Sequence, residues 1–111
     1  MNINISSNID KIVEYRNFVV ETDTIALYLY RVELDTTGKI VTCPDCLIKD
    51  INTAQYIGSF QIHAIEDELT NNINKRISLN IDFNKFIQVF ELISNTITKI
   101  ENKEYIYSKE S

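Results

Sequence analysis

Residues 82–101 read DFNKFIQVFELISNTITKIE, and this stretch decides the predicted fold. Its apolar residues recur every three or four positions, which is the spacing of one face of an α-helix. Asp82 stands where an N-cap is expected, and Lys99 near the other end suits the helix dipole. At about 1.5 Å per residue the helix would be roughly 30 Å long, enough to cover four strands. Its stripe consists of Phe83, Phe86, Ile87, Phe90, Ile93, Ile97 and Ile100.

The residues before this helix predict a strand and a hairpin. In residues 25–34 one apolar face runs through Ala26, Tyr28 and Tyr30 and continues to Val32 and Leu34, so we expect core packing for these tyrosines. Residues 35–39 read as a hairpin loop in which Gly38 takes a positive φ. A return strand is expected over 39–43. It should end at Pro44, which has no N–H for the ladder, and an irregular segment should follow to Asn52.

Two more strands are expected over residues 55–65 and 73–81, with the acidic run at 66–68 in the loop between them. In the first of these strands Tyr56, Phe60 and Ile62 should face inward, while Gln61 and His63 should face water. The chain therefore belongs to the α+β class, with about four antiparallel strands and the long C-terminal helix on one face.

The N-terminal residues fit two interpretations. Ile9, Ile12 and Val20 fall at helical spacing behind Ser7 as a cap, which favours a short helix beginning near Asn8. The run 18–20, Phe-Val-Val, favours a strand instead. We predict the short helix and keep the strand as the alternative.

Composition and charge narrow the function classes. The 111 residues suit a single domain over 1–111, and the net charge is −5 with a pI of about 4.8. An acidic chain is repelled by nucleic-acid backbones and anionic membranes, so direct binding to either is disfavoured. There is no apolar run of about 20 residues and no signal-peptide pattern at the N-terminus, which makes the cytosol the expected compartment.

Cys43-Pro44-Asp45-Cys46 is the single motif-like string. Two thiolates at this spacing can bind a metal or form a redox disulfide. A structural zinc needs four ligands, and the chain offers two cysteines and one histidine, His63. We therefore expect two structurally incidental thiols at a strand end, with no metal and no other cofactor.

His63 lies near three carboxylates, at 66–68, and such a group could act as a general base or hold a cation. No nucleophile stands at a diagnostic spacing from it, and Gly38 and Gly58 are isolated rather than part of a phosphate-binding loop. We expect no enzymatic activity.

These exclusions leave partner binding as the predicted function. Acidic side chains at strand ends would pair with Lys and Arg of a basic protein, and tyrosine would supply a desolvated anchor. Such a protein would be an immunity protein for a nuclease toxin or a phage-type inhibitor. The alternatives are an adaptor that forms a homodimer through a sheet edge or the long helix, and a CxxC metal or redox protein. The candidate partner-binding residues are Glu33, Asp35, Asp45, Glu66, Asp67, Glu68 and Tyr56.

Overall fold

The computed structural model describes residues 14–67, 69 and 72–104. They form an α+β unit in which five strands precede one long helix. The expected helix near Asn8 and the tail from Tyr105 lie outside the described residues. The elements are β1 (Glu14–Glu21), β2 (Ile25–Leu34), β3 (Ile40–Asp50), β4 (Gln55–Asp67), β5 (Asn72–Asn80) and α2 (Phe83–Glu101).

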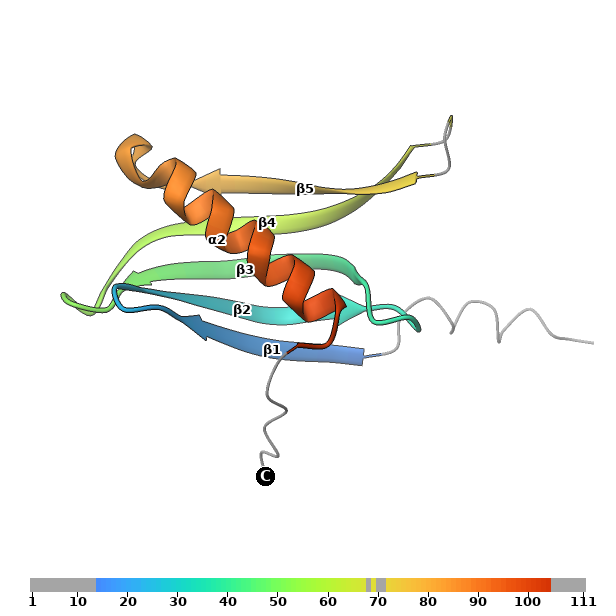
Figure 1. The fold of residues 1–111 in the computed structure, drawn as a ribbon, viewed down its shortest axis with the longest axis horizontal. Helices are drawn as coiled ribbons and strands as arrows, with labels where there is room; N and C mark the ends of the chain where they lie inside the picture. The colour runs from blue at the N-terminus through green and yellow to red at the C-terminus, as the bar shows by residue number, and fades with distance from the viewer. Residues whose placement is uncertain (1–13, 68, 70–71, 105–111) are drawn as a thin grey trace, which may run out of the picture.

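The strands form a single antiparallel meander in the order β1-β2-β3-β4-β5, so every strand pairs with its neighbours in sequence (Figure 1). Short turns suffice to join such strands. The sheet has five strands where the sequence predicted about four, because residues 14–21 pair with β2. Phe18 and Val20, which favour a strand, pack against the core from β1.

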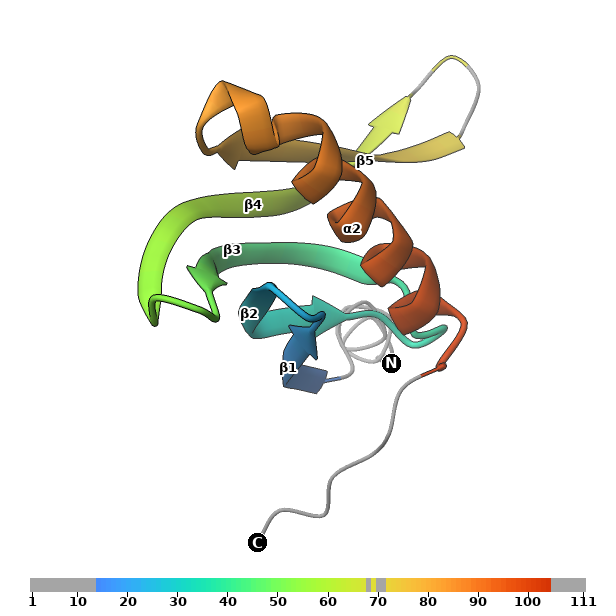
Figure 2. The same cartoon turned by 60° about the vertical axis from the view of Figure 1, so that its left-hand side comes forward.

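α2 confirms the helix predicted from the apolar stripe and crosses one face of the sheet diagonally (Figures 1 and 2). Asp82 occupies the N-cap position, but its side chain makes no capping hydrogen bond. The helix buries five residues against the sheet: Val89, Ile93, Thr96, Ile97 and Ile100. The first of these is the seventh residue of the helix, so residues 83–88 contribute no buried side chain to the core.

The C-terminal end of α2 is fixed by a carboxylate. Glu101 Oε2 accepts a hydrogen bond of 2.8 Å from the backbone N–H of Ile40 in β3, and it lies 3.0 Å from Lys75 Nζ in β5. A charge-assisted bond of this kind is stronger than one between neutral groups. Both carboxylate partners come from the sheet, so Glu101 ties the end of the helix to two separate strands.

β3 does not end at Pro44, which corrects the prediction of a strand break there. It continues to Asp50 through a β-bulge, in which Pro44 and Asp45 together stand opposite Gln61 of β4. A bulge leaves one residue out of the ladder, so the missing N–H of proline costs no strand pairing.

β2 carries a matching bulge, in which Tyr30 and Arg31 stand opposite Asn17 of β1. Arg31 takes a φ of 60°, and its backbone N–H donates to Asn17 Oδ1 at 2.9 Å. Since Tyr30 pairs with Asp45 across the β2–β3 ladder, the two bulges lie at the same level of the sheet.

The bulges decide which side chains face the helix. The extra residue in β2 lets Leu29 and Val32 share the buried face, and the one in β3 does the same for Cys43 and Cys46. Tyr28 and Tyr30 consequently point to the face opposite α2 rather than into the core predicted for them. The buried residues form one cluster between sheet and helix: Ile25, Leu27, Leu29, Val32, Leu34, Ile40, Cys43, Cys46, Ile48, Phe60, Ile62, Val89, Ile93, Ile97 and Ile100.

The hairpin loop agrees with its prediction, since Gly38 has a φ of 88°. A side chain there would also crowd Lys103 at the end of α2, which places this loop beside the C-terminus of the helix. Among the described residues no helix combines the length and the apolar character that crossing a bilayer requires.

Candidate functional site

The face of the sheet opposite α2, which we call the open face, is not covered by any described element (Figure 2). Successive residues of a strand point to opposite faces of the sheet, so the open face is lined by the residues that alternate with the core residues along each strand. Large side chains are unusually exposed there: Tyr15 at 54%, Val19 at 58%, Tyr30 at 37% and Tyr56 at 57%.

Three tyrosines from β2 and β4 meet near the middle of the open face. The Tyr28 ring stacks on that of Tyr30 with centroids 6.2 Å apart, and Tyr56 approaches Tyr28 edge-on at 6.4 Å. Lys49 Nζ lies 5.9 Å from the centre of the Tyr28 ring and 5.6 Å from that of Tyr56. These contacts hold the rings in place, so they present large surfaces at little further cost in side-chain entropy.

The alternation along the strand placed Tyr56 with the inward-facing residues, whereas its candidacy as a binding residue required exposure; it is 57% exposed and lies on the open face. A register irregularity between Ile48 and Lys49 pairs Tyr56 with Lys49 and shifts the start of β4 by one position. A shift of one residue exchanges the two faces of a strand. Farther along β4 the alternation follows the prediction, with Phe60 and Ile62 buried and Gln61 exposed.

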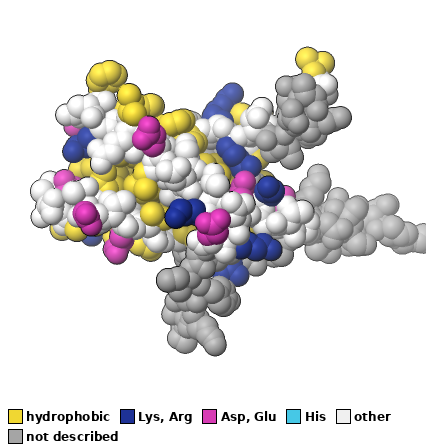
Figure 3. Space-filling view, viewed as in Figure 1, with side chains coloured by type: hydrophobic (Ala, Val, Ile, Leu, Met, Phe, Trp, Pro, Cys, Tyr) yellow, Lys and Arg dark blue, Asp and Glu magenta, His cyan; other side chains and the backbone are white. Residues whose placement is uncertain are grey.

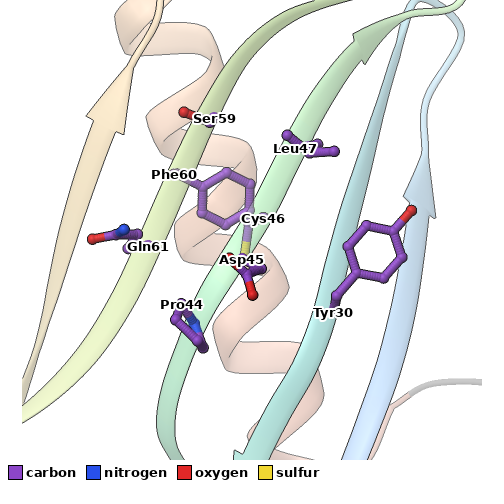
Figure 4. Close-up of a pocket in the computed structure, with 8 residues that line it drawn as sticks. All are labelled: Tyr30, Pro44, Asp45, Cys46, Leu47, Ser59, Phe60 and Gln61. Atoms are coloured by element: carbon purple, nitrogen blue, oxygen red, sulfur yellow. The ribbon is translucent and has the colours of Figure 1, made fainter.

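A shallow pocket of about 520 Å³ opens on this face beside the bulge in β3 (Figure 4). It lies where the β3–β4 ladder is interrupted, between the pairs Cys43–Ile62 and Cys46–Phe60. The Tyr30 ring and the Asp45 carboxylate stand on the open side, while Phe60 and Cys46 form the floor nearer to α2. Of its eight lining residues Asp45 alone is charged: Tyr30, Pro44, Asp45, Cys46, Leu47, Ser59, Phe60 and Gln61.

The two cysteines lie on the other side of β3, in the core. Their Sγ atoms are 3.1 Å apart and share a hydrogen bond, and neither side chain is more than 2% exposed. The hydrogen bond to Cys43 and then burial raise the pKa of the Cys46 thiol. A thiol with a raised pKa is a poor nucleophile and a poor metal ligand, and no three metal-ligating side chains gather within the described residues.

His63 faces away from the core, as predicted, but it does not meet a carboxylate among the described side chains. Its Nδ1 lies 3.0 Å from the hydroxyl of Thr42, and its neighbour across the β4–β5 ladder is Arg76. The carboxylates at 66–68 that the sequence places near His63 lie outside the described side chains.

Among the predicted acidic residues whose side chains are described, Asp45 lies apart from Glu33 and Asp35. Asp45 is exposed at the pocket rim, in the middle of β3 rather than near a hairpin end, and Glu33 is half-buried on the open face opposite Thr42. Glu66 and Asp67 form the end of β4, opposite Ile73 and Asn72. Their side chains and the whole of Glu68 lie outside what the structure describes.

Asp35 is part of the hairpin loop rather than of the open face. Its Oδ1 accepts hydrogen bonds from Thr37 Oγ1 at 2.7 Å, Thr37 N at 2.9 Å and Lys39 N at 3.0 Å. Slight burial by itself would raise the pKa of this carboxyl, but the hydrogen bonds from Thr37, Lys39 and Gly38 outweigh it and lower the pKa below 3.8. A carboxylate with these bonds stabilises its own loop.

Tyr30 and Leu47 were not predicted as site residues, because their orientation depends on the bulges. Gln61 was predicted to face water, but its place opposite the β3 bulge was not. The one sequence signal was Pro44 inside an otherwise strand-like run, which is characteristic of a bulge as well as of a strand end. Comparisons with protein-family models, with curated protein sequences and with solved structures each gave no significant match.

Proposed function

We propose that this chain is a non-catalytic protein-binding module that occludes a basic partner through its open face. An immunity protein for a nuclease toxin and a phage-type inhibitor both act in this way. The observation that carries the proposal is the pocket beside the β3 bulge, which has an aromatic wall, Tyr30, and a single charge, Asp45. This combination suits an arginine or lysine side chain, which can stack on the ring and pair with the carboxylate.

The surroundings of the pocket support the same interpretation. Tyr28 and Tyr56 extend the aromatic surface away from Tyr30, and tyrosine is enriched among residues that dominate binding energy. Two cations of this face are already placed against rings, Lys49 over Tyr28 and Tyr56 and Arg31 over Tyr15. The overall charge of −5 would speed association with a cationic protein.

The proposal is tested by affinity capture from lysate of the source cells, with wild type, Asp45→Lys and Tyr30→Ala as separate baits. We expect a basic protein that binds wild type, with each substitution weakening the purified complex by about 10-fold or more. Raising the salt from roughly 50 to 300 mM should weaken the wild-type complex and have less effect on the Asp45→Lys complex.

Asn95→Ala is a suitable control, because Asn95 is exposed on α2, on the other side of the sheet. It should bind like wild type. Equal capture by all four proteins would contradict the proposal, and so would turnover of a substrate by the purified chain. Circular dichroism on each bait separates lost binding from lost folding.

A further inference from the structure

The first half of α2 carries an apolar stripe that the fold covers only in part. Phe83 is 93% exposed, Ile87 72%, Phe90 39% and Phe86 38%. The rings of Phe86 and Phe90 stack with centroids 6.0 Å apart. We call these four residues the α2 ridge. They stand at i, i+3, i+4 and i+7, which is the pattern with which one helix packs against another.

The position of the ridge explains its exposure. In Figure 1 the first turn of α2 lies past the end of β5, at the edge of the sheet. The space-filling view shows hydrophobic side chains gathered at this end of the molecule (Figure 3). Soluble proteins rarely expose several large apolar side chains side by side unless a partner covers them.

The charges around the ridge indicate the chemistry of that partner. In the meander, the β1–β2 turn, the β3–β4 turn and the start of α2 all lie at one end of the sheet, and Ile51 N donates to Thr24 O at 2.9 Å between the two turns. We call residues 21–25, 50–55 and 80–83 the turn end. These segments contain no Lys or Arg and four acidic residues: Glu21, Asp23, Asp50 and Asp82.

Two cations adjoin these segments and offset the four carboxylates only in part. Lys49 is placed over two tyrosine rings on the open face, and Lys85 is half-buried on the flank of α2 away from the ridge. Glu91 adds one more exposed carboxylate on α2. At the opposite end Lys39, Lys99 and Lys103 lie near the carboxylates Asp35 and Glu101, and Figure 3 shows both signs of charge mixed there. The segments of the turn end differ because their only charged side chains are carboxylates.

We propose that the α2 ridge and the turn end together form a second docking surface, for a cationic amphipathic helix of a partner protein. The apolar face of that helix would pack along the ridge, and its Lys or Arg residues would face the four acids. A second copy of this chain is a poorer occupant, because its own acidic turn end would approach a surface of the same sign. An anionic membrane is disfavoured by the same repulsion. This surface is separate from the pocket on the open face.

The probe for the test is a labelled 18-residue helical peptide of leucine and lysine, with an apolar stripe and a cationic face. The controls are a leucine–glutamate peptide of the same pattern and a scrambled leucine–lysine peptide. Fluorescence anisotropy with the full chain at roughly 50 mM salt should show the cationic amphipathic peptide binding at least about 10-fold tighter than either control.

Phe83→Ser with Ile87→Ser should weaken this peptide about 10-fold or more, and Glu21→Lys with Asp23→Lys about 3- to 10-fold at low salt. The control is Val19→Ser with Ile65→Ser, which removes two other exposed apolar side chains away from the ridge. That variant should bind like wild type. Because Phe83 and Ile87 are exposed, their substitution should leave the far-ultraviolet circular dichroism and the unfolding midpoint unchanged.

Three results would overturn the proposal. One is peptide binding that both ridge substitutions leave unchanged. Another is a wild-type dimer in light scattering that the same substitutions convert to monomer. The third is binding to phosphatidylglycerol vesicles that depends on Phe83 and Ile87. None of these three results involves Asp45 or Tyr30, so the proposed function is tested separately by its own experiment.

Discussion

The two halves of α2 carry the same kind of stripe and meet different surroundings. In the C-terminal half Ile93, Ile97 and Ile100 are buried and Glu101 binds to β3 and β5. In the N-terminal half the α2 ridge projects into solvent. An apolar stripe thus fixes where a helix forms but not how much of it the sheet will cover. Matched substitutions in the two halves show which half contributes to the free energy of unfolding.

The largest expected effect is that of Ile93→Ala. Ile93 is fully buried in the core, so its truncation should lower the free energy of unfolding by about 2–5 kcal/mol. The matched substitution, Ile87→Ala, removes the same atoms from an exposed position of the same helix. It should change the free energy by no more than about 0.5 kcal/mol, since alanine also favours helix. Urea unfolding of both variants provides the measurement, and equal losses would show that the ridge is part of the folding core.

The rate at which the two cysteines react with a thiol reagent reports how readily the core between the sheet and α2 opens locally. Cys43 and Cys46 share the buried cluster with Ile93, and the raised pKa of Cys46 further lowers its thiolate fraction. A thiol-specific aromatic disulfide should label the native protein at least about 100-fold more slowly than the unfolded chain.

The two α2 variants sharpen that measurement. Ile93→Ala should accelerate labelling because it weakens the cover over the thiols, and Ile87→Ala should not. Rapid labelling of native wild type would mean that the C-terminal half of α2 leaves the sheet readily.

The anchor at Glu101 should have a smaller effect. Glu101→Ala removes the acceptor for Ile40 N and the partner of Lys75, which should cost about 1–2 kcal/mol in a half-buried site. Glu91→Ala, at an exposed position in the middle of the helix, should cost less than about 0.5 kcal/mol. Thermal unfolding of both variants distinguishes a specific anchor from a general effect of charge.

The smallest effect concerns the hairpin beside the C-terminus of α2. Because the folded pKa of Asp35 lies below its ordinary 3.8, its carboxylate stabilises the fold at pH values above 3.8. This contribution declines as the pH falls below 3.8 and through the folded pKa. Asp35→Asn should therefore destabilise the protein by less than about 1 kcal/mol at pH 7, since solvent screens the site.

The difference between Asp35→Asn and wild type should shrink as the pH falls through the folded pKa of Asp35, below which both side chains are neutral. Asp23→Asn, in the turn at the other end of the sheet, is the control. A difference for Asp35→Asn that persisted unchanged in acid would mean that the charge of Asp35 does not contribute.

The sequence predicted where the helix and strands lie better than it predicted which side chains of each strand face the core. The stripe from Phe83 to Ile100, the hairpin at Gly38 and the strand 25–34 follow from local periodicity and turn chemistry, and all three are confirmed. Which side chains of β2 and β3 face the core depends on the positions of the two bulges. The bulge in β2 requires a left-handed φ at Arg31, and arginine is not a residue type that indicates such a φ. Tyr30, and with it the pocket, could therefore not be placed from sequence.

The candidate site shows the same limit. Asp45 was identified from its charge alone, and its position beside Tyr30 emerges only from the pairing of β2 with β3. The strand kept as the alternative at the N-terminus forms over residues 14–21 as β1, because these residues pair with β2, while the helix predicted near Asn8 lies outside the described residues. Residue types show what a surface can bind, and only the register shows which residues share it.

The paired bulges make β2 and β3 dependent on each other in evolution. Deleting Arg31 alone would restore a regular β1–β2 ladder but shift β2 by one residue against β3. Val32, Leu34 or their partners would then turn toward solvent. Deleting Pro44 together with Arg31 would remove the extra residue from both strands at the same level and return every pair to register. Length changes in these two strands should therefore occur together, as compensating events, or be eliminated by selection.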